Sequence, residues 1–164
     1  MPHDSYDTGW QALRLAELEK YPLGLPVPDS FLDGIARQLL DICKTTAVLI
    51  SFFGTDDTLV KAWAGESSGP KAKLLFCDLV FHRGAYVEVG DTLQHPLFKH
   101  NPAVLGDPSI RFFSSTPFIN RNGFVLGSLC ALNKKPIEFT QEQRQEIVKL
   151  SIQVMDYLEG KRLE

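Results

Sequence analysis

The sequence has no cluster of basic residues and no long apolar run, and each absence excludes a class of partner. Its 17 Lys and Arg residues are outnumbered by 20 Asp and Glu residues, which gives a net charge of −3. A nucleic-acid-binding surface requires a basic patch, whereas the basic runs here are as short as Lys134-Lys135. No stretch approaches the roughly 18 apolar residues of a membrane-spanning helix. We therefore expect no nucleic-acid partner and no membrane partner.

Cysteine is scarce, and its distribution indicates a compartment. The three cysteines, Cys43, Cys77 and Cys130, are odd in number and lie in apolar surroundings. A disulfide framework would need paired cysteines, so these residues indicate a reducing environment. The N-terminal residues also lack the charged and apolar regions of a secretion signal. We expect a cytoplasmic protein.

The residues that are present suffice for one domain. Apolar residues make up 44% of the 164 residues, and 11 of them are Phe, which is enough for one hydrophobic core. Three prolines and one glycine at 22–28 end the first predicted helix. We expect an N-terminal helix and linker at residues 1–28 and a single domain at residues 29–164.

Four segments are predicted to form helices. Two begin with a Thr followed three residues later by Gln, which is the spacing of a capping box. Apolar residues then recur with helical periodicity. The first and last helices both carry apolar stripes, so they are expected to pack together on one face of a sheet and to form a dimer interface. The expected helices begin at Thr8, at Asp29 or Ser30, at Lys71 and at Thr140.

Short apolar runs between turn residues predict the strands. The clearest hairpin joins 111–119 to 124–132 through Asn120-Arg121-Asn122-Gly123. Segment 90–109, which contains three prolines and two glycines, is predicted to be a long loop with one or two helical turns. Because hairpins join most strands, the sheet should be largely antiparallel, in an α+β fold of packed layers. The remaining strands are expected at 46–53, 58–64 and 85–89.

An ordered series of residues over most of the chain resembles bacterial GAF domains. Phe31 to Ala36 is similar to the first core helix of that family, and Phe76-Cys77-Asp78 is similar to its mid-domain helix. The resemblance implies a GAF/PAS-like central antiparallel sheet of five or six strands. It places N- and C-terminal helices on one face, and a pocket under the mid-domain helix and long loop on the other. The second half of the series is Asp91-Thr92, Pro96-Leu97-Phe98, Asn101-Pro102, Gly106, Ile110-Arg111-Phe112-Phe113, Pro117, Gly123, Gly127-Ser128-Leu129-Cys130 and Phe139-Thr140.

The resemblance also implies a function. GAF domains usually sense a small molecule and signal through their terminal helices to a kinase or cyclase. We therefore expect a non-catalytic sensory domain that forms a homodimer through its terminal helices. The kinase or cyclase would lie on another chain or in an excised part of this one. Two alternatives are a thiol enzyme like the free methionine-(R)-sulfoxide reductases and a dimerisation module without a ligand.

The candidate ligand-binding residues come from matching GAF positions. A ligand site combines apolar walls with a few convergent polar groups. Arg111 is the most specific candidate, because a guanidinium can hold a carboxylate or phosphate through two hydrogen bonds. We favour the alternative that Arg111 pins the long loop by pairing with Asp91 or Asp107. The sequence identifies neither the ligand nor a cofactor. The candidates are Phe52, Trp63, Phe76, Tyr86, Arg111, Phe113 and Thr116.

Cyclic-nucleotide binding is not favoured. GAF domains that bind cyclic nucleotides carry an Asn-Lys pair, then a Phe, then an Asp-Glu pair. Asn133-Lys134 and Phe139 match the first two elements, but Gln143 and Arg144 stand where the acidic pair belongs. In those domains a lysine paired with a carboxylate of the acidic pair would clamp the closing helix. Because that carboxylate is missing here, we interpret Asn133-Lys134 as turn residues.

The reductase alternative requires a thiolate of low pKa and a resolving cysteine within reach. The reductases cluster their cysteines around the long loop, and segment 90–109 contains none. Free cysteines are among the most often buried residues. Core packing is therefore the favoured interpretation of all three.

Cofactor attachment has weak support. Covalent tetrapyrrole binding in this family uses Cys followed by His, whereas Cys77 is followed by Asp78. Asp91 and His95 have only a loose metal-ligand spacing, and no third ligand is apparent in the sequence. Haem ligation could involve His82, His95 or His100, but we interpret these as surface histidines.

Overall fold

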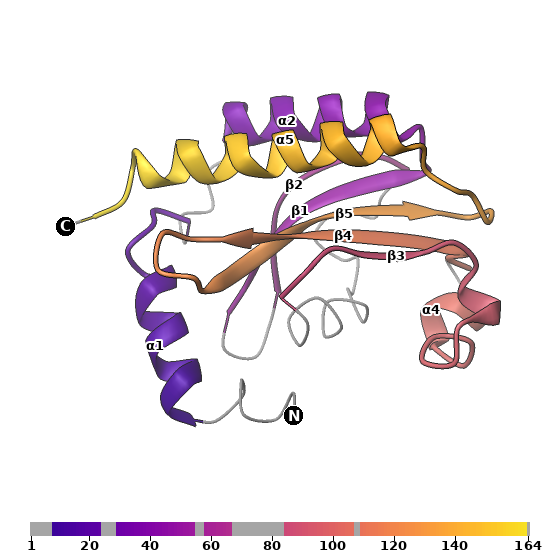
Figure 1. Cartoon of the computed structure of the whole chain (residues 1–164), viewed down its shortest axis with the longest axis horizontal. Coiled ribbons are helices and arrows are strands. Elements are labelled where there is room, and N and C mark those ends of the chain that lie inside the picture. Colours follow the sequence, from indigo (N-terminus) through magenta and orange to yellow (C-terminus); the bar gives the residue numbers. More distant parts are fainter. Residues whose placement is uncertain (1–7, 24–28, 55–57, 67–83, 107–108, 164) are drawn as a thin grey trace.

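A five-stranded antiparallel sheet lies at the centre of the computed structural model (Figure 1). The structure describes residues 8–23, 29–54, 58–66, 84–106 and 109–163. The strand order is β2-β1-β5-β4-β3, so β5 is the central strand. The strands are β1 (Ala47–Phe53), β2 (Thr58–Gly65), β3 (Val87–Val89), β4 (Phe112–Ile119) and β5 (Val125–Asn133).

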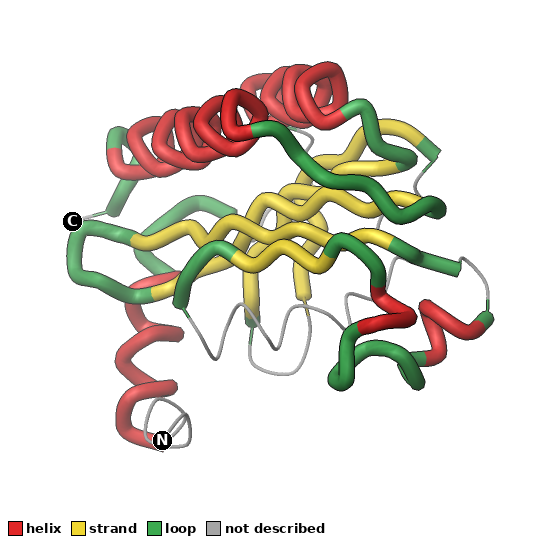
Figure 2. The backbone as a smooth tube through the Cα atoms, turned by 45° about the vertical axis from the view of Figure 1, so that its right-hand side comes forward, coloured by secondary structure: helices red, strands yellow, loops and turns green. Residues whose placement is uncertain are grey.

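Two capped helices cover one face of the sheet. Helix α2 (Ser30–Cys43) begins after Asp29, whose side chain accepts a hydrogen bond from the Leu32 N–H at 3.0 Å. Helix α5 (Gln141–Glu159) begins with the predicted capping box, since Thr140 and Gln143 exchange both hydrogen bonds. The two helices lie side by side on the sheet (Figures 1 and 2).

Helix α1 (Thr8–Leu18) occupies a different place from the one predicted for it. It lies on the other side of the sheet from α2 and α5, near the β4–β5 turn, and α2 takes the position beside α5 (Figures 1 and 2). The reason is the chemistry of its inward side, where Arg14 and Glu17 are buried. Arg14 donates to the carbonyl oxygens of Val125 and Gly54. Such a helix requires polar partners rather than the apolar face on which α2 packs.

The central strands are buried on both faces, so their side chains divide into two cores. The helix-side core lies beneath α2 and α5 and includes Ile50, Phe52, Phe112 and Phe118. The far-side core lies on the opposite face. It consists of Leu49, Val60, Val87, Val89, Phe98, Val104, Ile110, Phe113, Cys130 and Leu132.

The predicted loop before β4 carries two short helical turns, as expected. They are η3 (Thr92–Gln94) and α4 (Pro102–Leu105). Thr92 is fully buried and donates its hydroxyl to the Ile110 carbonyl, which fixes the loop to the start of β4. The helix predicted at 71–83 lies outside the described residues. No helix in the described part of the chain is long and apolar enough to cross a membrane.

Gly127 allows β5 to approach β1 closely. A Cβ atom built at Gly127 would lie 1.9 Å from the Ser51 carbonyl oxygen and 2.8 Å from the Phe52 Cα. Both contacts are with backbone, which cannot move aside without breaking the β1–β5 ladder.

We expect Gly127→Ala to lower the free energy of unfolding by about 3 kcal/mol, because overpacking at this point separates two central strands. Gly34→Ala is the control, since the nearest atom to its added Cβ would be 3.9 Å away. Alanine in a helix interior should raise stability by roughly 0.5–1 kcal/mol. Urea denaturation of both variants measures the difference. Equal stability of the two variants would contradict the packing argument.

Candidate functional site

Four small polar side chains lie in the middle of the far face. Ser51, Ser115, Ser128 and Cys130 are each fully buried, and they come from the three central strands. Ser51 lies opposite Ser128 across the β1–β5 ladder, and Ser115 lies opposite Cys130 across the β5–β4 ladder. The Cys130 Sγ is 3.2 Å from the Ser128 hydroxyl and 3.5 Å from the Ser115 hydroxyl. We call these four residues the hydroxyl patch.

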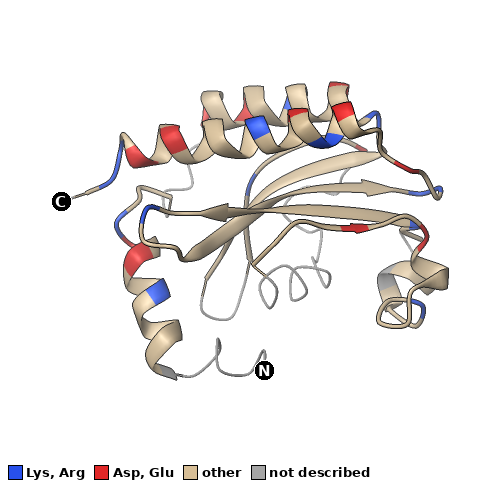
Figure 3. Ribbon diagram, in the orientation of Figure 1, with Lys and Arg blue, Asp and Glu red and all other residues tan. Residues whose placement is uncertain are grey.

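Ser51 gives the hydroxyl patch unused hydrogen-bonding capacity. Its Oγ is buried and has no hydrogen-bond partner among the described residues. A buried hydroxyl without a partner costs about 1–3 kcal/mol, so such groups are rare in folded proteins. The strands β1, β4 and β5 contain no charged residue (Figure 3). The patch therefore offers neutral donors and acceptors on strands that carry no charge.

Apolar side chains and an anchored loop flank the hydroxyl patch. Phe113 is fully buried in the far-side core, where its ring lies 6.2 Å from that of Phe98. Trp63 lies opposite Leu49 on the edge strand β2, on the same face, and is 44% exposed. Arg111 donates from Nη1 to the Val104 carbonyl. It therefore pins α4, which agrees with the predicted pinning role, although its partner is a carbonyl and not the predicted Asp91.

The structure does not bring the seven candidate residues to one site. Trp63 and Phe113 belong to the far face, as predicted for a pocket. Phe52 packs in the helix-side core against Phe118, with ring centroids 5.3 Å apart. Tyr86 and Thr116 line a groove beside α5, because β-strand alternation turns Thr116 away from its neighbour Ser115. Phe76 lies outside the described residues, and Asp107, the other predicted partner of Arg111, does as well.

The sequence interpretation missed the hydroxyl patch, although a signal for it exists. Ser51 interrupts the apolar run of β1, and Ser128 interrupts that of β5. A small hydroxyl residue inside a strand that is apolar on both sides marks a polar point on one buried face. The register that places these residues opposite one another could not be read from either strand alone.

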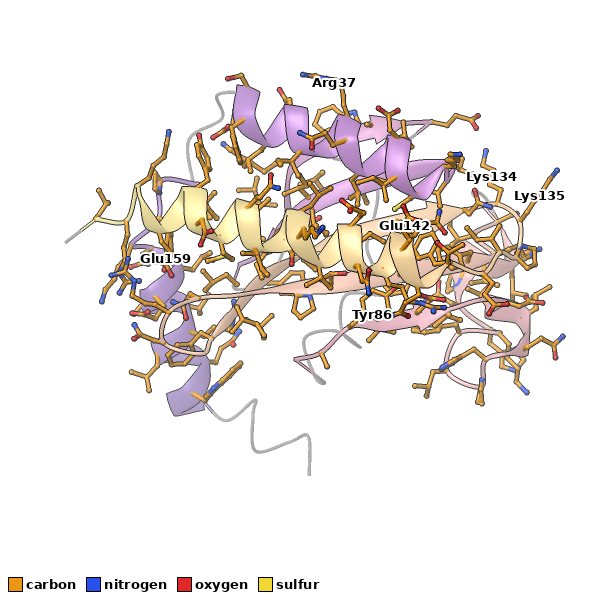
Figure 4. The ribbon with its side chains drawn as sticks, turned by 45° about the horizontal axis from the view of Figure 1, so that its top comes forward. Arg37, Tyr86, Lys134, Lys135, Glu142 and Glu159 are labelled. Carbon is orange, nitrogen blue, oxygen red and sulfur yellow. The ribbon has the colours of Figure 1, made fainter. Side chains whose placement is uncertain are left out.

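A salt bridge clamps the closing helix α5 to the sheet. Arg144 donates from Nε and Nη2 to the two carboxylate oxygens of Glu88 on β3, each at 2.9 Å. Burial is the largest single influence on Glu88 and opposes its ionisation, but the hydrogen bonds from Arg144 and Tyr86 together with the Arg144 charge lower the carboxyl pKa. Tyr86 donates its hydroxyl to the same carboxylate, and burial followed by this bond raises the tyrosine pKa. Tyr86 lies beneath α5 in Figure 4.

This clamp explains the departure from the cyclic-nucleotide pattern. The expected acidic position on α5 holds the cation Arg144, and the carboxylate lies on the sheet. Asn133 serves the adjoining turn, since its side chain accepts from both the N–H and the hydroxyl of Thr46. Its amide donates to the Lys135 carbonyl. The predicted turn role of Asn133 is thereby confirmed.

Two of the three thiols lie in separate cores. Cys43 belongs to the helix-side core, and burial raises its pKa to about 12. Cys130 belongs to the far-side core and is fully buried. The sheet separates these two thiols, so they cannot form an attacking and resolving pair. Cys77 lies outside the described residues. Among the described side chains, no group of three His, Cys, Asp or Glu residues could hold a metal ion.

Glu17 joins both ends of the chain to the β4–β5 turn. Its Oε1 accepts from the side-chain amides of Asn120 at 2.8 Å and Asn122 at 2.6 Å. Arg162, beyond the end of α5, donates to both carboxylate oxygens. Lys20 forms a further ion pair at 3.2 Å. Hydrogen bonds from Arg162 and then Asn122 lower the Glu17 pKa from 4.5 to about 2, against the opposing effect of burial.

A second carboxylate extends this connection. Glu159 accepts from the Tyr21 hydroxyl at 2.8 Å and from the Arg121 backbone N–H at 2.8 Å. Arg121 also donates from Nε to Glu159 at 2.9 Å. Glu159 lies at the end of α5 near α1 (Figure 4). We call the group formed by Glu17, Tyr21, Asn120, Asn122, Glu159 and Arg162 the terminal junction.

Comparison with known proteins gives one family and a common fold. The sequence profile of the GAF domain matches residues 28–158. A cyclic di-GMP phosphodiesterase of Pseudomonas aeruginosa is 38% identical over 61 residues, which are 37% of this chain and 10% of that protein. The chain thus spans only a small part of this relative's length.

Two solved structures share the fold at low identity. The GAF domain of an Acinetobacter phosphoenolpyruvate-protein phosphotransferase has a TM-score of 0.67 and 21% identity, over 92% of this chain and 90% of that one. A type II free methionine-R-sulfoxide reductase from Thermoplasma acidophilum has a TM-score of 0.65 and 15% identity, over 82% and 94% of the chains. At these identities the likeness concerns the fold alone.

We expect Glu17→Gln to lower the free energy of unfolding by about 1–2 kcal/mol at pH 7, allowing for solvent screening. Because the folded pKa is depressed, the carboxylate contributes this stability above the unfolded pKa. The contribution disappears as the pH falls from 4.5 toward 2. The wild-type and variant stabilities, measured by urea denaturation, should therefore converge over this range. Glu146→Gln removes an exposed pair with Lys149 and should change stability by less than about 0.5 kcal/mol. A gap for Glu17→Gln that does not vary with pH would refute the ionic role.

Proposed function

Because this chain belongs to the GAF domain family, we propose that it is a sensory domain that binds a small, uncharged polar molecule on the far face of its sheet. The observation that carries the proposal is the Ser51 hydroxyl, which is buried in the hydroxyl patch and has no hydrogen-bond partner in the described part of the chain. A ligand that donates or accepts there would recover the cost of burying it. The uncharged strands favour a neutral hydrogen-bonding group over a phosphate or carboxylate, which would need a compensating charge.

We propose that the signal leaves through the terminal junction. Strands β4 and β5 carry three of the four residues of the hydroxyl patch, and the turn that joins them carries Asn120 and Asn122, which donate to Glu17. A shift of these strands on ligand binding would therefore move the contacts that hold both terminal segments. A ligand changes this equilibrium only by binding one arrangement more tightly than the other. The receiver would be a kinase or cyclase elsewhere in a longer protein or on another chain.

The predicted homodimer through the terminal helices stays a prediction. Helix α1 is not beside α5, so an interface shared by these two helices would require a different arrangement of α1. The outer side of α5 does expose Val148 and Ile152, which are 42% and 55% accessible. Both side chains line the groove beside α5.

Native mass spectrometry of the purified protein, compared with its denatured mass, tests the sensor proposal first. Where no ligand is retained, thermal shift with nucleosides, neutral sugars and amino-acid amides follows. We expect Ser51→Ala to leave the stability of the unliganded protein unchanged or slightly higher, because the hydroxyl has no partner to lose. The same variant should bind the ligand about fivefold more weakly.

Ser114→Ala is the matched control, since Ser114 is buried on the other face of the same sheet. It should bind the ligand as the wild-type protein does. Equal affinity of the Ser51→Ala variant would remove the hydroxyl patch from the ligand site. Absence of both retained mass and any thermal shift would favour a dimerisation module without a ligand.

Catalysis by a thiol is the second candidate, because a reductase shares the fold and Cys130 lies in the hydroxyl patch. We expect no turnover of free methionine sulfoxide in the presence of dithiothreitol, since the two described thiols, Cys43 and Cys130, lie in separate cores and cannot act as an attacking and resolving pair. The assay measures free methionine. Turnover that Cys130→Ala or Cys77→Ala abolishes, and Cys43→Ala preserves, would establish the reductase instead.

A further inference from the structure

The tip of the β4–β5 hairpin carries an Asn-Gly pair, Asn122-Gly123. Both residues are exposed, and a Cβ atom built at Gly123 would meet no atom within 4 Å. Glycine has no side chain to shield its backbone nitrogen, and it adopts a wider range of backbone conformations than any other residue. The turn therefore presents an asparagine side chain to an unhindered backbone nitrogen.

The chemistry open to this pair is cyclisation followed by hydrolysis. The Gly123 nitrogen, once it has lost its proton, attacks Cγ of the Asn122 side chain, and a C–N bond forms as the bond from Cγ to Nδ2 breaks. The leaving amino group takes up a proton and departs as ammonia, which leaves a five-membered succinimide ring. Water then opens the ring at either carbonyl and gives aspartate or isoaspartate. No oxidation or reduction takes place, and water is the only other reactant.

The other asparagines are less suited to this reaction. Asn101 precedes Pro102, which has no backbone N–H to lose. Asn120 and Asn133 precede residues with long side chains, which crowd the attacking nitrogen. Asn120 is also buried. Among the asparagines of this sequence, Asn122 is thus the one at which cyclisation is least hindered.

Asn122 belongs to the terminal junction, so its conversion would change a contact that joins both ends of the chain. Its Nδ2 donates to the Glu17 Oε1 at 2.6 Å. Deamidation replaces this donor with a carboxylate oxygen, which has no proton to donate and carries the same charge as Glu17. The hydrogen bond becomes a repulsive contact between two anions. Arg162, which donates to Glu17, would be attracted to both carboxylates, and its hold on Glu17 would weaken.

Isoaspartate would disturb the turn as well. Its main chain runs through the former side chain and is longer by one carbon atom. The backbone N–H groups of Asn122 and Phe124 both donate to the Asn120 Oδ1 at 3.0 Å. The Gly123 N–H donates to the Asn120 carbonyl, also at 3.0 Å. A longer main chain between residues 122 and 123 would move the Gly123 and Phe124 donors away from these acceptors.

The closed junction restrains the reaction. The attacking nitrogen of Gly123 is held by the Asn120 carbonyl, and the leaving amide of Asn122 is held by Glu17. Both hydrogen bonds must open before the nitrogen can reach Cγ. The rate of cyclisation therefore follows the fraction of molecules in which the turn is open.

We propose that Asn122 is a site of spontaneous deamidation and that its conversion to aspartate or isoaspartate irreversibly opens the terminal junction. The modification releases the contacts through which Glu17 and Arg162 join the two ends of the chain. Because it consumes only water, it needs neither an enzyme nor a ligand. It does not depend on ligand binding at the hydroxyl patch.

Ageing of the full chain tests the chemistry. The protein is incubated at mildly alkaline pH, and peptide mass spectrometry follows the gain in mass as a hydroxyl replaces the amino group. We expect faster conversion at Asn122 than at Asn120 or Asn133, with release of ammonia in equal amount. Conversion at Asn122 that is no faster than at Asn133 overturns the proposal.

Glu17→Gln tests whether the junction restrains the reaction. The neutral side chain holds Arg162 and Asn122 less firmly than a carboxylate does, so conversion at Asn122 should become severalfold faster. Conversion at Asn133 in the same variant should stay unchanged, which separates local opening from global unfolding. An unchanged rate at Asn122, or an equal rise at Asn133, overturns the proposal.

A matched set of variants tests the consequence. Asn122→Asp reproduces one product, Asn122→Ser removes the amide without adding a charge, and Gln153→Glu adds the same charge at an exposed position of α5. The measurement is hydrogen exchange of the Leu163 amide, which donates to the Lys20 carbonyl at 2.6 Å and so reports whether the two ends are joined. We expect Asn122→Asp to speed this exchange about tenfold, Asn122→Ser to speed it less, and Gln153→Glu to leave it unchanged. Exchange at the wild-type rate in Asn122→Asp, or an equal rise in Gln153→Glu, overturns the proposal.

Discussion

The burial of three uncharged strands on both faces is the constraint on which the rest of the structure depends. Because β1, β4 and β5 are covered on each side, alternate residues must satisfy two different environments. On the face of the sheet covered by α2 and α5, these residues are large and apolar. The far side combines apolar residues with the hydroxyls of Ser51, Ser115 and Ser128. A register slip of one residue would exchange these two sets. The packing of β1 against Gly127 opposes such a slip, since other residues carry a Cβ that would meet the Ser51 carbonyl.

Helix placement follows from the same division. An apolar stripe brings α2 to the sheet, whereas α1 buries the polar residues Arg14 and Glu17 against strand ends and a turn. The attachment of α1 is therefore directional, because hydrogen bonds and ion pairs require particular partners at particular distances. Apolar packing fixes the layer of helices, and the terminal junction fixes where the two ends of the chain meet. A protein that changes the position of its ends on binding needs hydrogen bonds and ion pairs like those of the terminal junction. Such contacts can exchange between discrete arrangements.

The sequence was informative wherever a local pattern determined the structure. Asp29 and Thr140 cap helices as expected, and the hairpin around Asn120 forms between the predicted strands. Patterns that combine distant segments were less informative. The similar apolar stripes of α1 and α2 did not reveal which helix packs on the sheet, because that depended on partners for Arg14 and Glu17. Thr116 and Ser115 are neighbours in sequence, yet only the observed pairing places them on opposite faces.

The two buried hydroxyls without a partner among the described residues, those of Ser51 and Thr116, flank the central strand β5 on opposite faces of the sheet. Ser51 is opposite Ser128, and Thr116 is opposite Leu129, so both are cross-strand neighbours of adjacent β5 residues. Each hydroxyl without a partner lowers stability, and apolar packing alone gives no reason to keep one on each face at the same point. A ligand at the hydroxyl patch would bond β1, which is directly paired with that point of β5. A change in the β5 register or twist that favours the ligand then alters the geometry of β4 around Thr116 on the opposite face. Such coupling is reciprocal by thermodynamic necessity. The sheet itself, rather than a chain of surface contacts, would then transmit a change on the far face to the side beneath α5.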